Sequence, residues 1–212
     1  TYNDKLEMLN FEYLKNLNEA QKEAVLYLDG PLLIVAGAGS GKTKVLTSRI
    51  AHIIKEKKAF PNQILAVTFT NKAAKEMQNR VSLILKKEAI GLSWLGTFHS
   101  ISAKLLRKHA TKIGLNANFT IIDQDDQVRL IKNICKSENI DTKHLAPKYI
   151  LSIIDRWKNK GFYPDQVIIN KKDIYEKIVF PLYKIYQQKL LDLNTCDFGD
   201  LILHCVYIFE KY

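Results

Sequence analysis

Residues 32–43 read LLIVAGAGSGKT, an apolar run that leads into a glycine-rich turn and the tripeptide Gly-Lys-Thr. Apolar residues then recur at helical spacing, namely Val45, Leu46, Ile50, Ile53 and Ile54. Strand, glycine-rich turn and helix form the context in which a phosphate-binding loop is found. We therefore predict a buried strand over residues 32–36, a phosphate loop, and a helix that runs to about residue 56.

The loop has the composition that binding a polyphosphate requires. Small residues let backbone N–H groups turn inward, and the N-terminus of the following helix adds partial positive charge. Lys42 is placed to reach the β- and γ-phosphates, and the Thr43 hydroxyl to ligate Mg²⁺. The competing interpretation is a glycine-rich turn with an incidental lysine. The predicted loop contacts are Ala36, Gly37, Ala38, Gly39, Ser40, Gly41, Lys42 and Thr43.

Composition and charge narrow the class of protein. The 212 residues are 47% hydrophobic and 25% charged, as in an ordinary soluble globular protein. No apolar run reaches the ~18 residues of a membrane span, and three cysteines without metal spacing predict the reducing cytoplasm. A net charge of +10 favours a polyanion such as nucleic acid, although scattered solvated lysines would give the same sum. Judged alone, the basic residues of the second half are interpreted as solvated faces and not as contacts, namely Arg156, Lys158, Lys160, Lys171 and Lys172.

The rest of the chain predicts an α/β fold. Apolar runs at 64–70 and 93–96 each pass into a helical pattern. The first pattern puts one apolar face on its helix, formed by Ala73, Ala74, Met77, Val81, Ile84 and Leu85. Strands that alternate with helices argue for a parallel sheet with helices on both faces. Ligands of such sheets bind at the carboxyl ends of the strands. After residue 115, one short strand (119–122) is followed by helical pattern with breaks at Pro147, Gly161, Pro164 and Pro181, which predicts an α-helical insertion.

Five segments, taken in order, resemble the N-terminal part of superfamily 1 DNA helicases of the UvrD/Rep/PcrA type. They are residues 17–25, 36–43, 67–77, 97–100 and 197–201. The resemblance implies a RecA-like P-loop fold, ATP and Mg²⁺ as cofactors, and 3′-to-5′ movement along single-stranded DNA. It also implies a first motor domain at 1–114, an α-helical insertion at 115–191 that meets duplex DNA at the junction, and a return to the first domain at 192–212.

The resemblance assigns site residues as well. It gives Gln21 and Lys44 a place beside the adenine, although Gln21 also fits a capping box with Asn18. The residues implied to contact nucleic acid are Thr68, Phe69, Thr70, Asn71, Thr97 and His99. Judged without the resemblance, Phe69 is a core phenylalanine and His99 a helix-start histidine.

Two departures from the family pattern shape the expectations. Lys44 stands where relatives often have arginine, and an ammonium lacks the planar group that stacks on a base. No Asp-Glu pair follows an apolar strand, so the Mg²⁺-holding aspartate, the arginine finger and the second motor domain are expected outside these 212 residues. We expect a fragment that is inactive alone and whose partner is the C-terminal motor domain of the same protein.

Two other functions remain open. The chain could belong to a recombination helicase–nuclease of the same superfamily, which a downstream nuclease domain would indicate. It could instead be a stand-alone nucleotide-dependent binding module whose polyanion is RNA or a protein.

Overall fold

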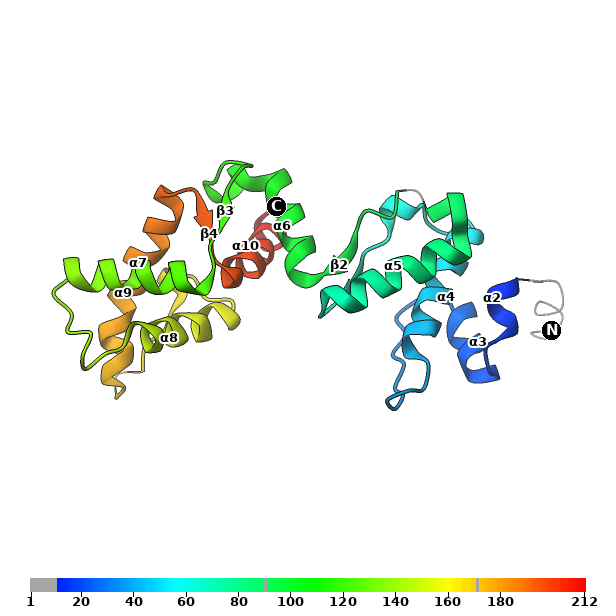
Figure 1. Ribbon diagram of the computed structural model, residues 1–212, viewed down its shortest axis with the longest axis horizontal. Helices are drawn as coiled ribbons and strands as arrows, with labels where there is room; N and C mark the ends of the chain where they lie inside the picture. The colour runs from blue at the N-terminus through cyan, green and yellow to red at the C-terminus, as the bar shows by residue number, and fades with distance from the viewer. Residues whose placement is uncertain (1–10, 90, 171) are drawn as a thin grey trace. The chain divides into compact units, whose positions relative to one another are not determined.

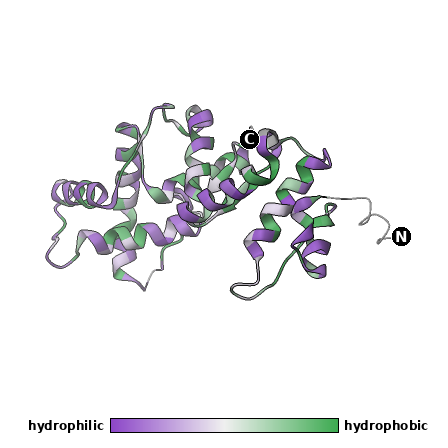
Figure 2. Ribbon diagram, turned by 45° about the vertical axis from the view of Figure 1, so that its right-hand side comes forward, coloured by the Kyte–Doolittle hydropathy of each residue, from purple (hydrophilic) through white to green (hydrophobic). Residues whose placement is uncertain are grey.

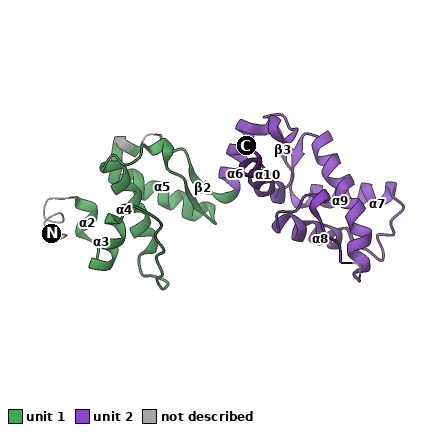
Figure 3. Ribbon diagram, turned by 180° about the vertical axis from the view of Figure 1, so that it is seen from behind, with its two compact units in different colours: residues 1–98 green, residues 99–212 purple. Residues whose placement is uncertain are grey.

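The computed structural model describes residues 11–89, 91–170 and 172–212. The chain divides into two compact units, Thr1–Phe98 and His99–Tyr212 (Figure 3). Both units are mostly helical with short parallel strands (Figure 1), and most helices have one hydrophobic and one hydrophilic side (Figure 2). Among the described residues, no helix is both long enough and apolar enough to span a membrane.

The first unit places two short parallel strands against a long helix. Its elements are α2 (Glu12–Lys15), α3 (Glu19–Leu26), α4 (Lys42–Lys55), η1 (Pro61–Gln63), β1 (Ala66–Thr68), α5 (Asn71–Leu85), η2 (Lys86–Ala89) and β2 (Leu95–Thr97). Strand β1 pairs with β2 in parallel, and α5 contacts both strands. Met77, Val81 and Leu85, which the helical periodicity placed on one face of α5, are buried against α4 and β1.

The predicted strand at 32–36 is not formed in this chain. Its residues have no regular secondary structure, and the side chains of Leu33 and Val35 are 86% and 87% exposed. A strand is stable only when its backbone pairs with a neighbour. Among the described residues, β1 and β2 pair with each other and no strand pairs with residues 32–36. The single large sheet with helices on both faces is therefore replaced by two small parallel sheets.

The second unit is a helical body with one more parallel strand pair. Its elements are α6 (Phe98–His109), η3 (Ala110–Ile113), β3 (Thr120–Ile121), α7 (Gln124–Ser137), α8 (Pro147–Asn159), η4 (Pro164–Gln166), α9 (Ile174–Asp192), β4 (Thr195–Cys196) and α10 (Phe198–Lys211). Strand β3 pairs in parallel with β4. The predicted break at Pro181 is wrong, because α9 continues through it. Buried Val179, Leu182 and Tyr183 hold α9 on either side of the proline.

Candidate nucleotide-binding and nucleic-acid-binding sites

The glycine-rich loop before α4 has a backbone that only glycine adopts easily. Gly39 and Gly41 have φ of 75° and 85°, and Gly41 is the N-cap of α4. A Cβ atom on Gly41 would lie 2.9 Å from Nε2 of Gln21, whereas one on Gly37 or Gly39 would meet nothing within 4 Å. The loop therefore has free space beside Gly37 and Gly39, and α4 starts directly behind the loop. This arrangement fits a phosphate group at the helix N-terminus.

The two residues with predicted phosphate and metal roles begin α4. The Lys42 ammonium donates to the carbonyl oxygens of Ala36 and Gly37, at 2.7 and 2.6 Å. Thr43 is exposed beside it in the first turn. The ammonium therefore lies within the loop and is bound to groups that a phosphate oxygen can replace. The contacts of both residues with nucleotide and Mg²⁺ stay predictions.

Gln21 joins the start of α3 to the loop. Asn18 and Gln21 form the predicted capping box: the Gln21 amide oxygen accepts from the Asn18 backbone N–H at 3.0 Å, and the Asn18 side chain accepts from the Gln21 backbone at 2.9 Å. The amide nitrogen of Gln21 donates to the carbonyl of Ser40 at 3.0 Å. Gln21 thus both caps α3 and contacts the phosphate loop. Lys44 is the other residue that the resemblance places beside the adenine. Its ammonium donates to the Asn16 backbone carbonyl at 2.5 Å.

The predicted DNA-contact segments leave the sheet of the first unit at one edge. Thr68 and Thr97 are register partners at the carboxyl ends of β1 and β2. The segments that follow bring the rings of Phe69 and Phe98 to 5.4 Å between centroids, tilted by 41°. Phe69 is 88% exposed, so it is not a core residue, and Phe98 is 41% exposed. The two rings form an exposed aromatic pair.

The polar residues beside this pair differ in what they offer a ligand. The Thr70 hydroxyl accepts from the Ala73 backbone at 3.1 Å and caps α5, so its first role is structural. Asn71 is exposed at the first position of α5, whereas Thr97 is only 7% exposed. Their predicted DNA contacts stay predictions, and Thr97 presents the least side-chain surface.

His99 opens the second unit and lies beside the first turn of α10. Its exposed ring meets the ring of Phe198 edge to face, with 5.7 Å between centroids and 71° between planes. Both residues line a cleft of about 560 Å³, which Asp155 and Lys158 of α8 also line. The helix-start position of His99 is confirmed, and its side chain faces solvent there.

The interpretation of Lys158 as part of a solvated face is wrong. Its side chain is 0% exposed, and its ammonium lies 2.6 Å from Asp197 and 2.8 Å from Asp200, both of which are also buried. Ile150, Ile154 and Lys158 recur every four residues, which puts Lys158 on the buried face of α8. That spacing is the sequence signal that would have identified it. Arg156 lies at the surface in an ion pair with Glu176.

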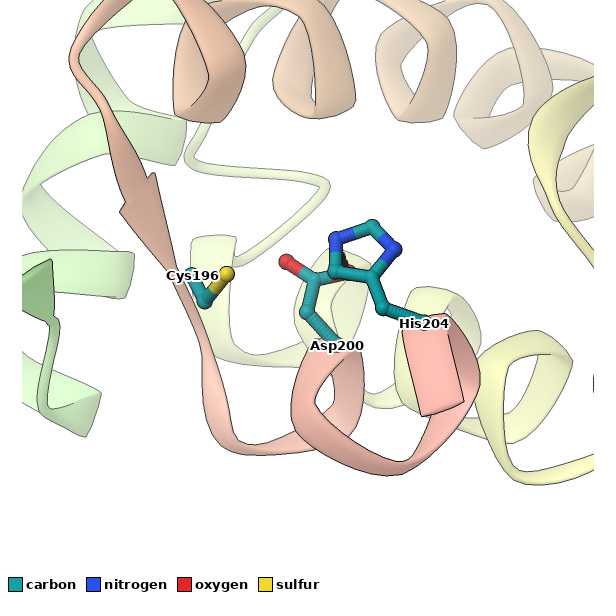
Figure 4. A group of neighbouring side chains, drawn as sticks. All are labelled: Cys196, Asp200 and His204. Atoms are coloured by element: carbon teal, nitrogen blue, oxygen red, sulfur yellow. Dashed lines mark ion pairs between the residues drawn. The ribbon is translucent and has the colours of Figure 1, made fainter. Parts of the chain in front are cut away.

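Cys196, Asp200 and His204 place one potential metal-ligating atom each within 4.8 Å of one another (Figure 4). The carboxylate of Asp200 is already used: one oxygen accepts from Lys158 and from Gln187, and the other from the Asp197 backbone. Burial, followed by the nearby Asp200 and Asp197, raises the pKa of the Cys196 thiol and keeps it protonated. The donor set is that of an ion-pair network, and we assign it no metal.

A glycine-rich loop that ends in a lysine at the start of a helix is the arrangement of P-loop nucleotide-binding proteins. The chain matches the family described as the UvrD/REP helicase N-terminal domain over residues 17–212, and it belongs to that family.

The relatives of this chain are named as DNA helicases, and two of the following three are named as ATP-dependent. A probable DNA helicase II homolog of Rickettsia conorii is 48% identical over 207 residues, which are 96% of this chain and 31% of the relative. The ATP-dependent DNA helicases PcrA of Staphylococcus epidermidis and Bacillus subtilis are 46% and 45% identical, over 93% and 94% of this chain and 27% of each relative. The chain thus spans less than a third of the length of these relatives.

Proposed function

We propose that the chain is the N-terminal, ATP-binding part of an ATP-dependent DNA helicase. The complete protein would translocate 3′ to 5′ on single-stranded DNA and unwind duplexes at single-strand/double-strand junctions, in replication or repair in the cytoplasm. The observation that carries the proposal is the parallel register of Thr68 with Thr97, which brings both predicted DNA segments to one strand edge. The names of the relatives favour DNA as the polymer.

In this proposal, the phosphate loop holds the triphosphate of ATP. Lys42 exchanges the carbonyls of Ala36 and Gly37 for phosphate oxygens, and the first N–H groups of α4 donate to the same group. The Thr43 hydroxyl holds Mg²⁺, which would neutralise charge that develops on the phosphates. Gln21 and Lys44 flank the nucleotide, with Gln21 fixed against the loop through Ser40.

The exposed aromatic pair supplies a surface on which bases can stack without being read. Stacking of a base on an aromatic ring is worth about 1–3 kcal/mol and tolerates any sequence, as a translocating motor requires. Polar residues flank Phe69 and Phe98 in the sequence or follow them closely, namely Thr68, Thr70, Asn71, Thr97 and His99. Hydroxyl, amide and imidazole groups suit contacts with the sugar–phosphate backbone.

We further propose that residues 1–114 and 192–212 form one motor domain, with residues 115–191 as its helical insertion. Two apolar surfaces support a larger sheet with helices on both faces. One is the exposed run at residues 32–35, and the other is a row on α10 formed by Phe198, Ile202, Val206 and Phe209. Surfaces of this kind mark sites where further chain packs. The C-terminal motor domain of the same protein would add the remaining ATP contacts.

The test is unwinding of labelled duplexes that carry a 3′ or a 5′ single-stranded tail by the complete protein. We expect ATP-dependent strand separation of the 3′-tailed duplex, lost in Lys42→Ala. Strand separation from the 5′ tail alone would refute the polarity, and binding without any unwinding would favour the stand-alone module. ATP-dependent shortening of the labelled strands would favour the helicase–nuclease.

A further inference from the structure

A buried ion-pair network joins three helices in the second unit. Lys158 of α8 bonds to Asp197, the N-cap of α10, and to Asp200 in its first turn. From α9, the Tyr186 hydroxyl donates to Asp197 at 2.9 Å and the Gln187 amide donates to Asp200 at 2.9 Å. Asp197 and Asp200 also cap each other's backbone N–H groups, so the start of α10 is fixed at several points.

The network stays charged in spite of its burial. Burial acts to lower the pKa of Lys158, but the two carboxylates outweigh it and raise that pKa above its usual range. Burial likewise acts to raise the pKa of Asp200, and Lys158 and then His204 outweigh it and lower that pKa. A buried charge without its partner is very costly. The network therefore holds α8 and α10 in one arrangement.

The close packing of Lys158 on α10 leaves little freedom at the position next to Phe198. A Cβ atom on Gly199 would lie 3.0 Å from Cδ of Lys158 and 3.3 Å from the Asp197 carboxylate. The same turn of α10 carries Phe198, whose ring meets His99. About two turns later, the Cys205 thiol lies 3.6 Å from the Ser102 carbonyl of α6. Helix α6, which bears His99, thus contacts α10 at two places.

We propose that Lys158 is a positioning residue for DNA binding: through Asp197 and Asp200 it fixes Phe198, and Phe198 fixes the ring of His99. This inference rests on the proposed DNA contact of His99. Lys158 itself touches no DNA, because its ammonium is buried and surrounded by protein partners. The proposed helical insertion, which bears Lys158, would thereby influence the DNA contact of His99.

The test uses the complete protein with single-stranded oligo-dT. Gly199→Ala places a methyl group 3.0 Å from Cδ of Lys158, so that Lys158 or the start of α10 has to shift, and it leaves every charge in place. We expect the DNA concentration that half-saturates ATP hydrolysis to rise by about five- to tenfold, the scale of one weakened contact, with the rate at saturating DNA unchanged. Lys158→Met should shift it in the same direction. A merely structural role would lower turnover at every DNA concentration without moving the half-saturation point.

Two further variants separate the possible outcomes. Lys160→Met removes an exposed positive charge at the end of the same helix and should leave the half-saturation point unchanged. His99→Ala should raise it, and adding Gly199→Ala in that background should have no further effect, because both act through one contact. Additive effects, or Gly199→Ala behaving like the wild type, would overturn the positioning role. An unaffected His99→Ala would instead refute the DNA contact on which it rests.

Discussion

Phe69 is largely exposed to solvent, which indicates that its ring serves binding and not the hydrophobic core. Its ring is 88% exposed and contacts Phe98 on one side. Substitution of an exposed residue usually changes the free energy of unfolding by less than about 0.5 kcal/mol. We therefore expect Phe69→Ala to leave the thermal midpoint nearly unchanged, yet to weaken single-strand binding by about 1–3 kcal/mol.

Fluorescence anisotropy with a labelled oligonucleotide and a thermal melt of the same sample would measure both quantities. Phe60→Ala is the matched control, since Phe60 is 71% exposed but lies before η1 and not at the strand edge. Loss of stability in Phe69→Ala with unchanged DNA affinity would show that the ring serves folding.

Among single residues, Lys158 shows what the sequence could reveal and what it could not. The spacing of Lys158 from Ile150 and Ile154 puts it on the buried face of α8. The role of a buried lysine, however, follows only from the groups that it pairs with. Asp197 and Asp200 lie about 40 positions further along the chain, at 39 and 42 residues. A contact of that separation depends on the tertiary fold, so no local pattern predicts it.

Among elements, α10 has a buried histidine that links its stability to pH. Burial lowers the pKa of His204 below its ordinary value of 6.5, although Asp200 acts to raise it; Lys158 lowers it further. The ring also bonds to the Tyr163 hydroxyl. Because the unfolded chain takes up a proton at a higher pH than the folded one, stability is lost as pH falls below 6.5.

We expect the thermal midpoint of the second unit to decrease as the pH is lowered from about 7.5 to 5.5. The decrease should be smaller in His204→Gln. Circular dichroism melts across this range would measure it. His144→Gln is the control, because it makes the same substitution at a histidine whose side chain is 90% exposed. An identical pH dependence in wild type and His204→Gln would contradict the assignment.

Helices were easier to predict than strands, for a physical reason. The apolar face of α5 and the capping box of α3 are local patterns, and both are confirmed. A strand depends on a partner elsewhere in the chain, and so residues 32–36, although apolar, stay unpaired among the described residues. The predicted helix break at Pro181 was wrong for the opposite reason. The local preference of proline to end a helix is overridden by the tertiary packing of α9.

At the scale of the whole chain, the two candidate sites would bind different ligands: nucleotide at one and DNA at the other. The phosphate loop offers Lys42 and Thr43, and the strand edge offers Phe69 and its neighbours. Phosphoryl transfer also needs a positioned metal, an oriented water and cationic stabilisation of the phosphate oxygens. An arginine finger alone carries about 10³–10⁵ in rate. We therefore expect these 212 residues by themselves to show almost no ATP hydrolysis.

Phosphate release measured with and without single-stranded DNA tests the central claim most directly. The complete protein, its Lys42→Ala variant and the 212-residue chain would be compared in one assay. We predict DNA-stimulated hydrolysis by the complete protein, its loss in Lys42→Ala, and no stimulation in the 212-residue chain. Stimulated hydrolysis that survives in Lys42→Ala, or that the 212-residue chain performs alone, would contradict the account.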